Sequence, residues 1–212
     1  MANHEQRAWH REVISPATES TLQLVRSANL LDGFYLAGGT GLALQFGHRI
    51  SLDLDFFAPE HFEEDVLLQR VQKLAGFALA SKSPSTLHTT IQTTKVSFLG
   101  YSYPVLNAAN EFLGVPVADP RDIACMKMSA IASRGTKRDF IDLYFCARQL
   151  GLTEILSMFD RKYAQANVSR IHILKSLTYF GDAEKDPMPH MLVPFDWGTV
   201  KQFFVSGVPR LL

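Results

Sequence analysis

The chain has 212 residues, with 21 basic and 21 acidic side chains and a formal net charge of zero. A neutral chain has no overall electrostatic attraction to nucleic acid or to an anionic membrane, although a local basic surface can still attract phosphate. Hydrophobic residues make up 47% of the sequence, which is enough for a sizeable buried core.

Neither membrane insertion nor secretion is predicted. No apolar run approaches the length of a bilayer span, and the polar start MANHEQRAWHREV lacks the apolar segment of a signal peptide. Cys125 and Cys146 lie in helical patterns, without the spacing of a metal site or the density of a disulfide framework. We therefore expect a cytoplasmic protein with two core cysteines and no membrane partner.

The first half of the chain is predicted to be mixed α and β. Residues 1 to about 30 are expected to be helical, with Ser20 or Thr21 as the cap. The elements predicted next are strand 34–38, helix 40–47, strand 51–58, helix 63–75, and strands 77–84, 87–94 and 95–104. Residues 107–117 fit no regular element.

From residue 119 the hydrophobic period becomes helical. Asp119 and Pro120 form a good helix start, and Gly135 ends the first helix of this part. The predicted helices are 119–133, 137–151, 153–164, 168–181 and one around 198–206. The pattern predicts an α+β protein, with an α/β core over residues 1–118 and a helical region over 119–212.

Two acidic residues interrupt the apolar strand SLDLDFFA. Alternation places Asp53 and Asp55 on one face with Ser51, and Leu54 and Phe56 on the other. Neighbouring carboxylates repel each other, so solvent or a cation must offset the repulsion. Magnesium commonly takes one or two carboxylates plus substrate phosphates. An isolated D-x-D pattern also fits an edge strand with a solvated acidic face.

A double glycine stands one short helix before the acidic strand. Gly38 and Gly39 allow a positive φ or a close approach of the backbone to a ligand. Thr40 is predicted to cap the following helix, whose free amide groups attract phosphate. Together with the acidic pair, this turn predicts a nucleoside triphosphate site. Taken alone, Gly-Gly-Thr equally fits a tight strand-to-helix turn.

Lys127 and Asp142 each interrupt an apolar helical run, ACMKMSAI and FIDLYF respectively. A buried charge is costly unless it is paired. One interpretation is a purely structural Lys127–Asp142 pair. The other is that Lys127 reaches the triphosphate while Asp139 or Asp142 orients it. The sequence leaves both open.

Further basic residues invite two interpretations each. His48 and Arg49 could contact phosphate or form a solvated helix end. Arg134, Lys137 and Arg138 could guide RNA phosphates or form a solvated helix start. The scattered histidines show no ligand spacing and are expected to be surface or core residues: His10, His88, His172 and His190.

The stretch GGTGLALQFGHRISLDLDFF, followed by K-x-x-A-x-x-x-R-x-x-x-R-D-x-x-D, resembles the AbiEii/AbiGii toxin family of nucleotidyltransferases. That family belongs to the DNA-polymerase-β-like nucleotidyltransferase superfamily, and the resemblance covers roughly residues 30–150. It implies a small mixed sheet flanked by helices, with a C-terminal helical bundle that completes the site.

The resemblance also implies magnesium-dependent transfer of a nucleoside monophosphate from a nucleoside triphosphate to an acceptor. The implied catalytic residues are Asp53, Asp55, Lys127, Asp139 and Asp142, of which Asp53 and Asp55 would bind Mg²⁺. The implied nucleotide-binding residues are Gly38, Gly39, Thr40, Ser51 and Lys127, to which we add Arg49. Family toxins modify RNA, notably tRNA acceptor ends, so tRNA or another RNA and a cognate antitoxin are the expected partners.

One position departs from the superfamily pattern. A third carboxylate usually comes from a later strand, but KVSFLGY has Ser97 there. Asp139 could fill the role, the metal site could be weaker, or the chain could bind nucleotides or a partner without turnover. An antibiotic-modifying nucleotidyltransferase is a further alternative, although the block from Lys127 to Asp142 favours the toxin-like family.

Overall fold

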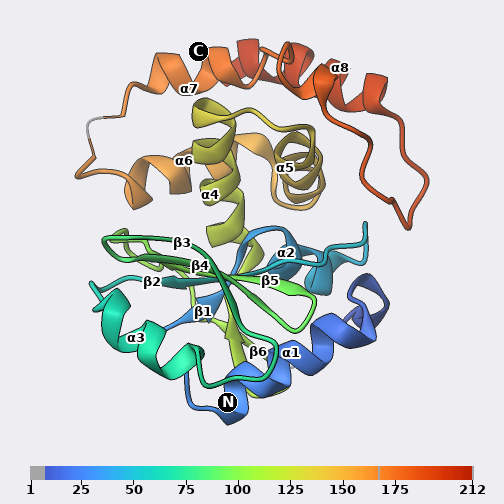
Figure 1. Cartoon of the computed structure of the whole chain (residues 1–212). Coiled ribbons are helices and arrows are strands. Elements are labelled where there is room, and N and C mark those ends of the chain that lie inside the picture. The colour runs from blue at the N-terminus through green and yellow to red at the C-terminus, as the bar shows by residue number, and fades with distance from the viewer. Residues whose placement is uncertain (1–7, 167, 212) are drawn as a thin grey trace, which may run out of the picture.

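The computed structural model describes residues 8–166 and 168–211 as an α+β structure (Figure 1). The strands are β1 Tyr35–Leu36, β2 Leu54–Ala58, β3 Ala78–Ser83, β4 Thr86–Ile91, β5 Thr94–Gly100, β6 Asn110–Phe112 and β7 Val115–Val117. The α-helices are α1 Pro16–Ser27, α2 Gly38–Phe46, α3 Glu64–Val71, α4 Pro120–Ser133, α5 Lys137–Leu150, α6 Leu152–Lys162, α7 Arg170–Ser176 and α8 Trp197–Gly207. Short 3-10 turns are η1 Arg11–Val13, η2 Ala183–Lys185 and η3 Val208–Leu211.

The strands form a single mixed sheet in the order β3-β4-β5-β2-β1-β7-β6. The β2–β5 and β1–β7 pairs are parallel, and the other pairs are antiparallel. This arrangement confirms the predicted small mixed sheet. Within residues 8–166 and 168–211, no helix has the length and apolar character that crossing a membrane requires.

Strand β2 divides its side chains between two cores. Leu54 and Phe56 are fully buried in the core that also contains residues of α1 and α3, and the Phe56 and Phe98 rings stack with centroids 5.5 Å apart. Phe57 packs instead against the core built by the later helices. The predicted alternation is therefore confirmed, and it turns Asp55 toward the helices.

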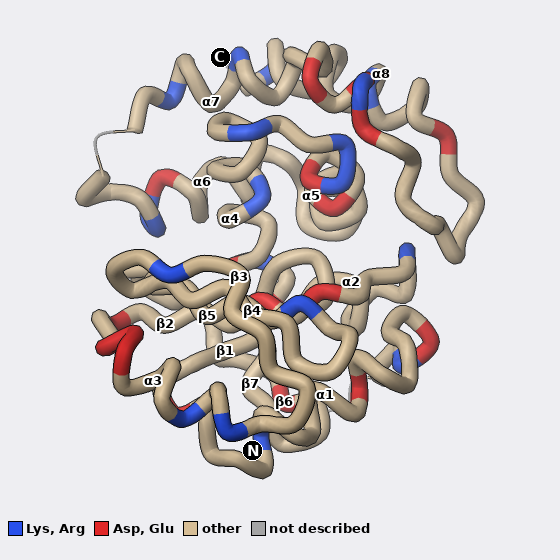
Figure 2. Tube along the Cα trace, in the orientation of Figure 1, with Lys and Arg blue, Asp and Glu red and all other residues tan. Residues whose placement is uncertain are grey.

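Helices α4, α5 and α6 lie over the face of the sheet opposite α1 and α3, and α7 and α8 lie beyond them, as Figure 1 shows. Asp119 caps α4 by accepting from Arg121 N at 2.9 Å, and Pro120 occupies the first turn. Thr136 caps α5. Acidic and basic residues are interspersed along both parts of the molecule (Figure 2).

The prediction that residues 107–117 are irregular is wrong, because this segment contains the hairpin of β6 and β7. Its two turn residues, Leu113 and Gly114, have φ values of 51° and 74°. Leucine rarely adopts this left-handed conformation, so the sequence carries no recognisable turn signal there. The hairpin joins the sheet by pairing β7 in parallel with β1.

The predicted cap of the first helix is also wrong. α1 begins at Pro16 and is capped by Ser15, whose Oγ accepts from Thr18 N at 3.0 Å. Proline presets the φ angle of a first helical residue, which places the cap one residue before it. Thr21 lies inside the helix, and its hydroxyl bonds Thr94 Oγ1 at 3.2 Å. Residues 1–7 of the predicted helical segment lie outside the described residues.

The predicted strand 51–58 is only partly confirmed. β2 begins at Leu54, so Asp53 precedes the ladder.

The segment around residues 190–192 returns to the stretch before β2. Ile50 N donates to His190 O at 2.8 Å, and Leu192 N donates to His48 O at 2.9 Å. The division of the chain between residues 118 and 119 stays a prediction.

Candidate active site

The glycine turn is shaped by close neighbours. Gly38 has a φ of 63°, and a Cβ placed on it would lie 3.1 Å from Asp55 Oδ2. A Cβ on Gly39 would overlap the Arg49 guanidinium and lie 3.2 Å from Ser51 Oγ. Only glycine therefore lets the carboxylate and the guanidinium approach this turn so closely.

Thr40 has a different role from the predicted cap. α2 begins at Gly38 without a side-chain cap, so that prediction is wrong. The buried Thr40 hydroxyl donates to the backbone carbonyl of Asp53 and is hydrogen-bonded to Ser51 Oγ at 2.8 Å. It thereby fixes the extended segment that carries Asp53. A contact between Thr40 and a nucleotide stays a prediction.

The two acids of the D-x-D motif lie close enough to interact. Both are partly exposed. Burial raises the pKa of the Asp55 carboxyl, the charge of Asp53 raises it further, and a hydrogen bond from Ser97 opposes these effects. The Asp53 carboxylate has no hydrogen-bond or ion-pair partner among the described residues. The pair therefore presents oxygen ligands whose mutual repulsion a cation would relieve.

Asp142 is the centre of a buried ion-pair cluster. Its fully buried carboxylate accepts from Arg49 Nε at 2.7 Å, Arg49 Nη2 at 2.8 Å and His48 Nε2 at 2.9 Å, and pairs with Lys127 Nζ at 2.7 Å. Burial favours the neutral acid, but the charges of Arg49 and Lys127 outweigh it and hold the pKa of Asp142 well below its usual value. The predicted Lys127–Asp142 pair is confirmed.

Asp139 extends the cluster along α5. Its carboxylate accepts from Lys127 Nζ and Arg134 Nε, both at 2.9 Å, and from Thr136 Oγ1 at 2.6 Å. Lys127 keeps a raised pKa, because the two aspartates outweigh the effect of its burial. Since cations and a hydroxyl occupy both oxygens of Asp139, it is unsuited to serve as the missing third carboxylate.

The interpretation of His48 and Arg49 as a solvated helix end is wrong, because both side chains are buried. Burial lowers the pKa of His48, which keeps its ring neutral. Arg49 also donates to the Ile50 carbonyl at 3.0 Å. The reason is tertiary: α5 covers this segment and brings Asp142 onto it.

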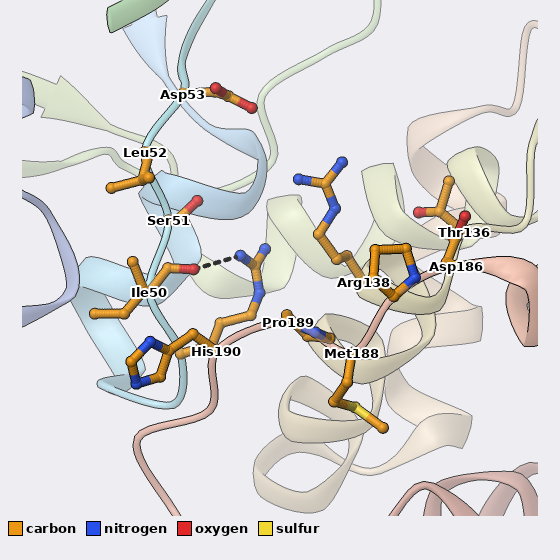
Figure 3. A pocket seen from close by; sticks show the side chains of 12 residues that line it. Ile50, Ser51, Leu52, Asp53, Thr136, Arg138, Asp186, Met188, Pro189 and His190 are labelled. Carbon is orange, nitrogen blue, oxygen red and sulfur yellow. Dashed lines mark hydrogen bonds between the residues drawn. The ribbon is translucent and has the colours of Figure 1, made fainter.

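Two cavities border the acidic pair. The first, here called the glycine cavity, has a volume of about 350 Å³ and is lined among others by Gly38, Asp55, His88, Tyr101, Lys127 and Arg134. The second, the strap cavity of about 450 Å³, is lined among others by Ser51, Asp53, Arg138, Met188 and His190 (Figure 3). The glycine cavity therefore lies between the glycine turn and Asp55.

Ser97 occupies the expected position of the third acid. In the parallel register of β2 and β5 it stands opposite Asp55, and its hydroxyl is 3.1 Å from His88 Nδ1. Among the described residues, no group of three or more acidic, histidine or cysteine side chains could hold a metal ion. His88, predicted as a scattered histidine, thus lines the candidate site. Only the β4–β5 register reveals this.

The predicted basic cluster is divided by the fold. Lys137 is buried, and its Nζ donates to the Asp186 carbonyl, so for Lys137 the interpretation as part of a solvated helix start is wrong. Arg134 lines the glycine cavity and Arg138 lines the strap cavity. Contacts of these two arginines with RNA stay a prediction.

Comparison with known proteins identifies the family. The model of the family described as nucleotidyl transferase AbiEii toxin, type IV TA system, matches residues 23–107 and 101–210. The chain belongs to the AbiEii nucleotidyltransferase toxin family. The predicted resemblance and the assignment as a nucleotidyltransferase enzyme are thereby confirmed.

The chain is also similar to a sequence relative and to solved structures. An uncharacterized protein of Aquifex aeolicus (strain VF5) is 39% identical over 197 residues, which cover 90% of this chain and 94% of the relative. A putative nucleotidyltransferase structure from H. pylori has a TM-score of 0.50 and 20% identity, covering 93% of this chain and 95% of its own. The nucleotidyltransferase toxin MenT4 of Mycobacterium tuberculosis H37Rv has a TM-score of 0.55 and 17% identity. The match covers 92% of this chain and 85% of the MenT4 chain. These two structures share the fold.

Removal of the central carboxylate should destabilise this AbiEii protein. Asp142→Ala leaves Arg49 and Lys127 buried without their common partner, so we expect a loss of about 3–5 kcal/mol in the free energy of unfolding. Urea denaturation followed by circular dichroism measures it. The control Asp160→Ala breaks an exposed pair with Arg170 and should cost less than about 1 kcal/mol. Equal losses in the two variants would contradict the central role of Asp142.

Stability should also fall in acid. The pKa values of Asp139 and Asp142 are lower in the folded protein than the value of about 3.9 for an unfolded aspartate. Their stabilising contribution is therefore complete above that unfolded pKa and is lost as the pH falls toward the folded values. Thermal denaturation between pH 7 and pH 2 measures this loss. A profile that is flat below pH 4 would contradict it.

Proposed function

We propose that this AbiEii-family enzyme uses Mg²⁺ to transfer a nucleoside monophosphate from a nucleoside triphosphate to an RNA acceptor such as tRNA. The observation that carries the proposal is the proximity of the Asp53–Asp55 pair to a left-handed glycine turn and to the cations Lys127 and Arg134. Oxygen ligands beside positive charges suit a metal-bound triphosphate.

The donor set is compatible with magnesium. Asp53 and Asp55 supply hard oxygen ligands, and among the described residues the Asp53 carboxylate makes no hydrogen bond or ion pair, although the charge of Arg49 acts on it. With Ser97 in place of a third acid, the remaining ligands would come from substrate phosphates and water, as is common for Mg²⁺. When bound there, the ion would neutralise charge on the α-phosphate and on the leaving pyrophosphate.

The glycine cavity is the proposed triphosphate site. Arg49, Lys127 and Arg134 share the carboxylates of Asp139 and Asp142, and the charges of Lys127 and Arg134 also act on Asp55. Lys127 and Arg134 line this cavity, where they would contact phosphate oxygens.

Part of the glycine cavity's lining is aromatic. Phe57 and Tyr101 lie there with their ring centroids 5.6 Å apart. Such rings suit a nucleobase, because every base has a flat face that can stack.

In the proposed reaction the acceptor hydroxyl attacks the α-phosphorus. A new bond forms between the acceptor oxygen and phosphorus, and the bond from phosphorus to the oxygen that bridges to the β-phosphate breaks. Pyrophosphate leaves, and the hydroxyl proton passes to solvent. The protein contributes mainly orientation and charge, which carry most of the catalysis in phosphoryl transfer.

The toxin role and the antitoxin are parts of the same proposal. The family description names a toxin–antitoxin system, and MenT4 is described as a nucleotidyltransferase toxin. Family membership thus favours a toxin over an antibiotic-modifying enzyme. We expect an antitoxin encoded beside this gene to restrain the activity.

The transfer should depend on the acidic pair. Asp55→Asn preserves the side-chain shape but removes the charge, so we expect labelling of RNA to fall at least about 100-fold. Purified protein is incubated with labelled nucleoside triphosphates, Mg²⁺ and total RNA, and pyrophosphate release is measured in parallel. Asp160→Asn, on the surface of α6, is the control. Labelling that persists in a folded Asp55→Asn variant would refute the assignment. Triphosphate binding without pyrophosphate release by the wild type would favour a binding module.

Removal of the metal ion should abolish the transfer, as removal of the Asp55 charge should. Treatment with EDTA should abolish labelling, and excess Mg²⁺ should restore it, because the triphosphate would otherwise meet two uncompensated carboxylates. Asp53→Asn should require more Mg²⁺ for half-maximal rate. Full activity in EDTA would contradict the role of a divalent ion.

A further inference from the structure

The two acids of the D-x-D motif border different cavities. Asp55 lines the glycine cavity, and Asp53 lines the strap cavity. The two cavities are neighbours at Gly39, which lines the glycine cavity, because a Cβ on this residue would touch Arg49 and Ser51, both of which line the strap cavity. The acidic pair therefore lies between two spaces, each large enough to hold part of a substrate.

Nucleotidyl transfer needs two such spaces. The attacking and leaving oxygens lie roughly in line on opposite sides of the phosphorus. If the triphosphate occupies the glycine cavity, the attacking hydroxyl must approach from elsewhere. The strap cavity, with a volume of about 450 Å³, opens on the Asp53 side of the pair.

Arg138 distinguishes the strap cavity from the ion-pair cluster. Arg49 and Arg134 form ion pairs with Asp142 and Asp139 respectively. Arg138 is exposed and has no hydrogen-bond or ion-pair partner among residues 8–166 and 168–211. Figure 3 shows it extending from α5 toward the segment with Asp53. A free guanidinium in a cavity suits a phosphate, which it can bind with two parallel hydrogen bonds.

Another part of the lining is the segment 186–190, here called the strap. Lys137 N donates to Asp186 Oδ2 at 2.9 Å at one end, and the carbonyl of His190 accepts from Ile50 N at 2.8 Å at the other. Between them lies the sequence Pro-Met-Pro of residues 187–189, in which Met188 is 50% exposed. Prolines have no N–H group and a fixed φ, so residues 187–189 form an apolar and stiff stretch between the polar Asp186 and His190, which also line the cavity.

We infer that the strap cavity is the acceptor site and takes the end of an RNA strand. A phosphate of the strand lies on Arg138, a base lies against residues 187–189, and the terminal hydroxyl points toward Asp53. The apolar stretch, the unpaired cation and the acid match the base, phosphate and hydroxyl of a nucleotide. The inference rests on the proposed function for the identity of the reaction.

Binding tests the site without requiring turnover. The probe is a short fluorescein-labelled single-stranded RNA with a free 3′ hydroxyl, titrated with full-length protein in Mg²⁺ without triphosphate and followed by anisotropy. Arg138→Ala should weaken binding about tenfold and reduce the slope of log Kd against log salt by about one. Arg138→Lys should retain part of the affinity. Arg148→Ala, an exposed arginine near the other end of α5, should bind like the wild type.

Kinetics then separate the two cavities. Arg138→Ala should raise KM for RNA about tenfold and leave KM for the triphosphate within about twofold, whereas Arg134→Ala should do the reverse. Unchanged RNA binding in folded Arg138→Ala, no RNA binding by the wild type, or a raised triphosphate KM in this variant would overturn the inference. If RNA binding depends on Arg138 but no transfer occurs, the proposed reaction fails and the RNA site stands.

Discussion

The site depends on the buried carboxylate of Asp142. It joins α5 to the segment after α2 through Arg49 and His48, and to α4 through Lys127. The cost of burying charges is offset only when all partners are present, so the sheet and the helices must meet in this one arrangement. The cluster thereby aligns the glycine turn, the acidic strand and the two cavities.

The same cluster explains why the turn needs glycine. Arg49 reaches Asp142 by passing Gly39, and the Asp55 carboxylate lies against Gly38. A side chain at Gly39 would displace the Arg49 guanidinium, whose position the ion pair with Asp142 fixes, and a side chain at Gly38 would crowd the Asp55 carboxylate. The two glycines thus leave the space beside the backbone that the charged side chains of Asp55 and Arg49 occupy. A role in phosphate binding is part of the proposed function.

Local patterns predicted most of the regular elements. Alternation in β2 predicted the buried faces of Leu54 and Phe56, and the Asp119–Pro120 start predicted α4, because these signals act over a few residues. The pairing of Lys127 with Asp142 was one of two open interpretations. The β6–β7 hairpin was missed, since its turn uses a left-handed Leu113. Ser15 was missed as a cap because Ser20 and Thr21 give similar local signals.

The sequence by itself determined the α+β class, the glycine turn and the acidic pair, because periodicity and short motifs encode them within one element. Only the tertiary structure decided that His48 and Arg49 are buried, that His88 stands beside Ser97, and that the strap closes a second cavity at Asp53. These features join elements up to about 140 residues apart in the chain, and packing alone sets such contacts.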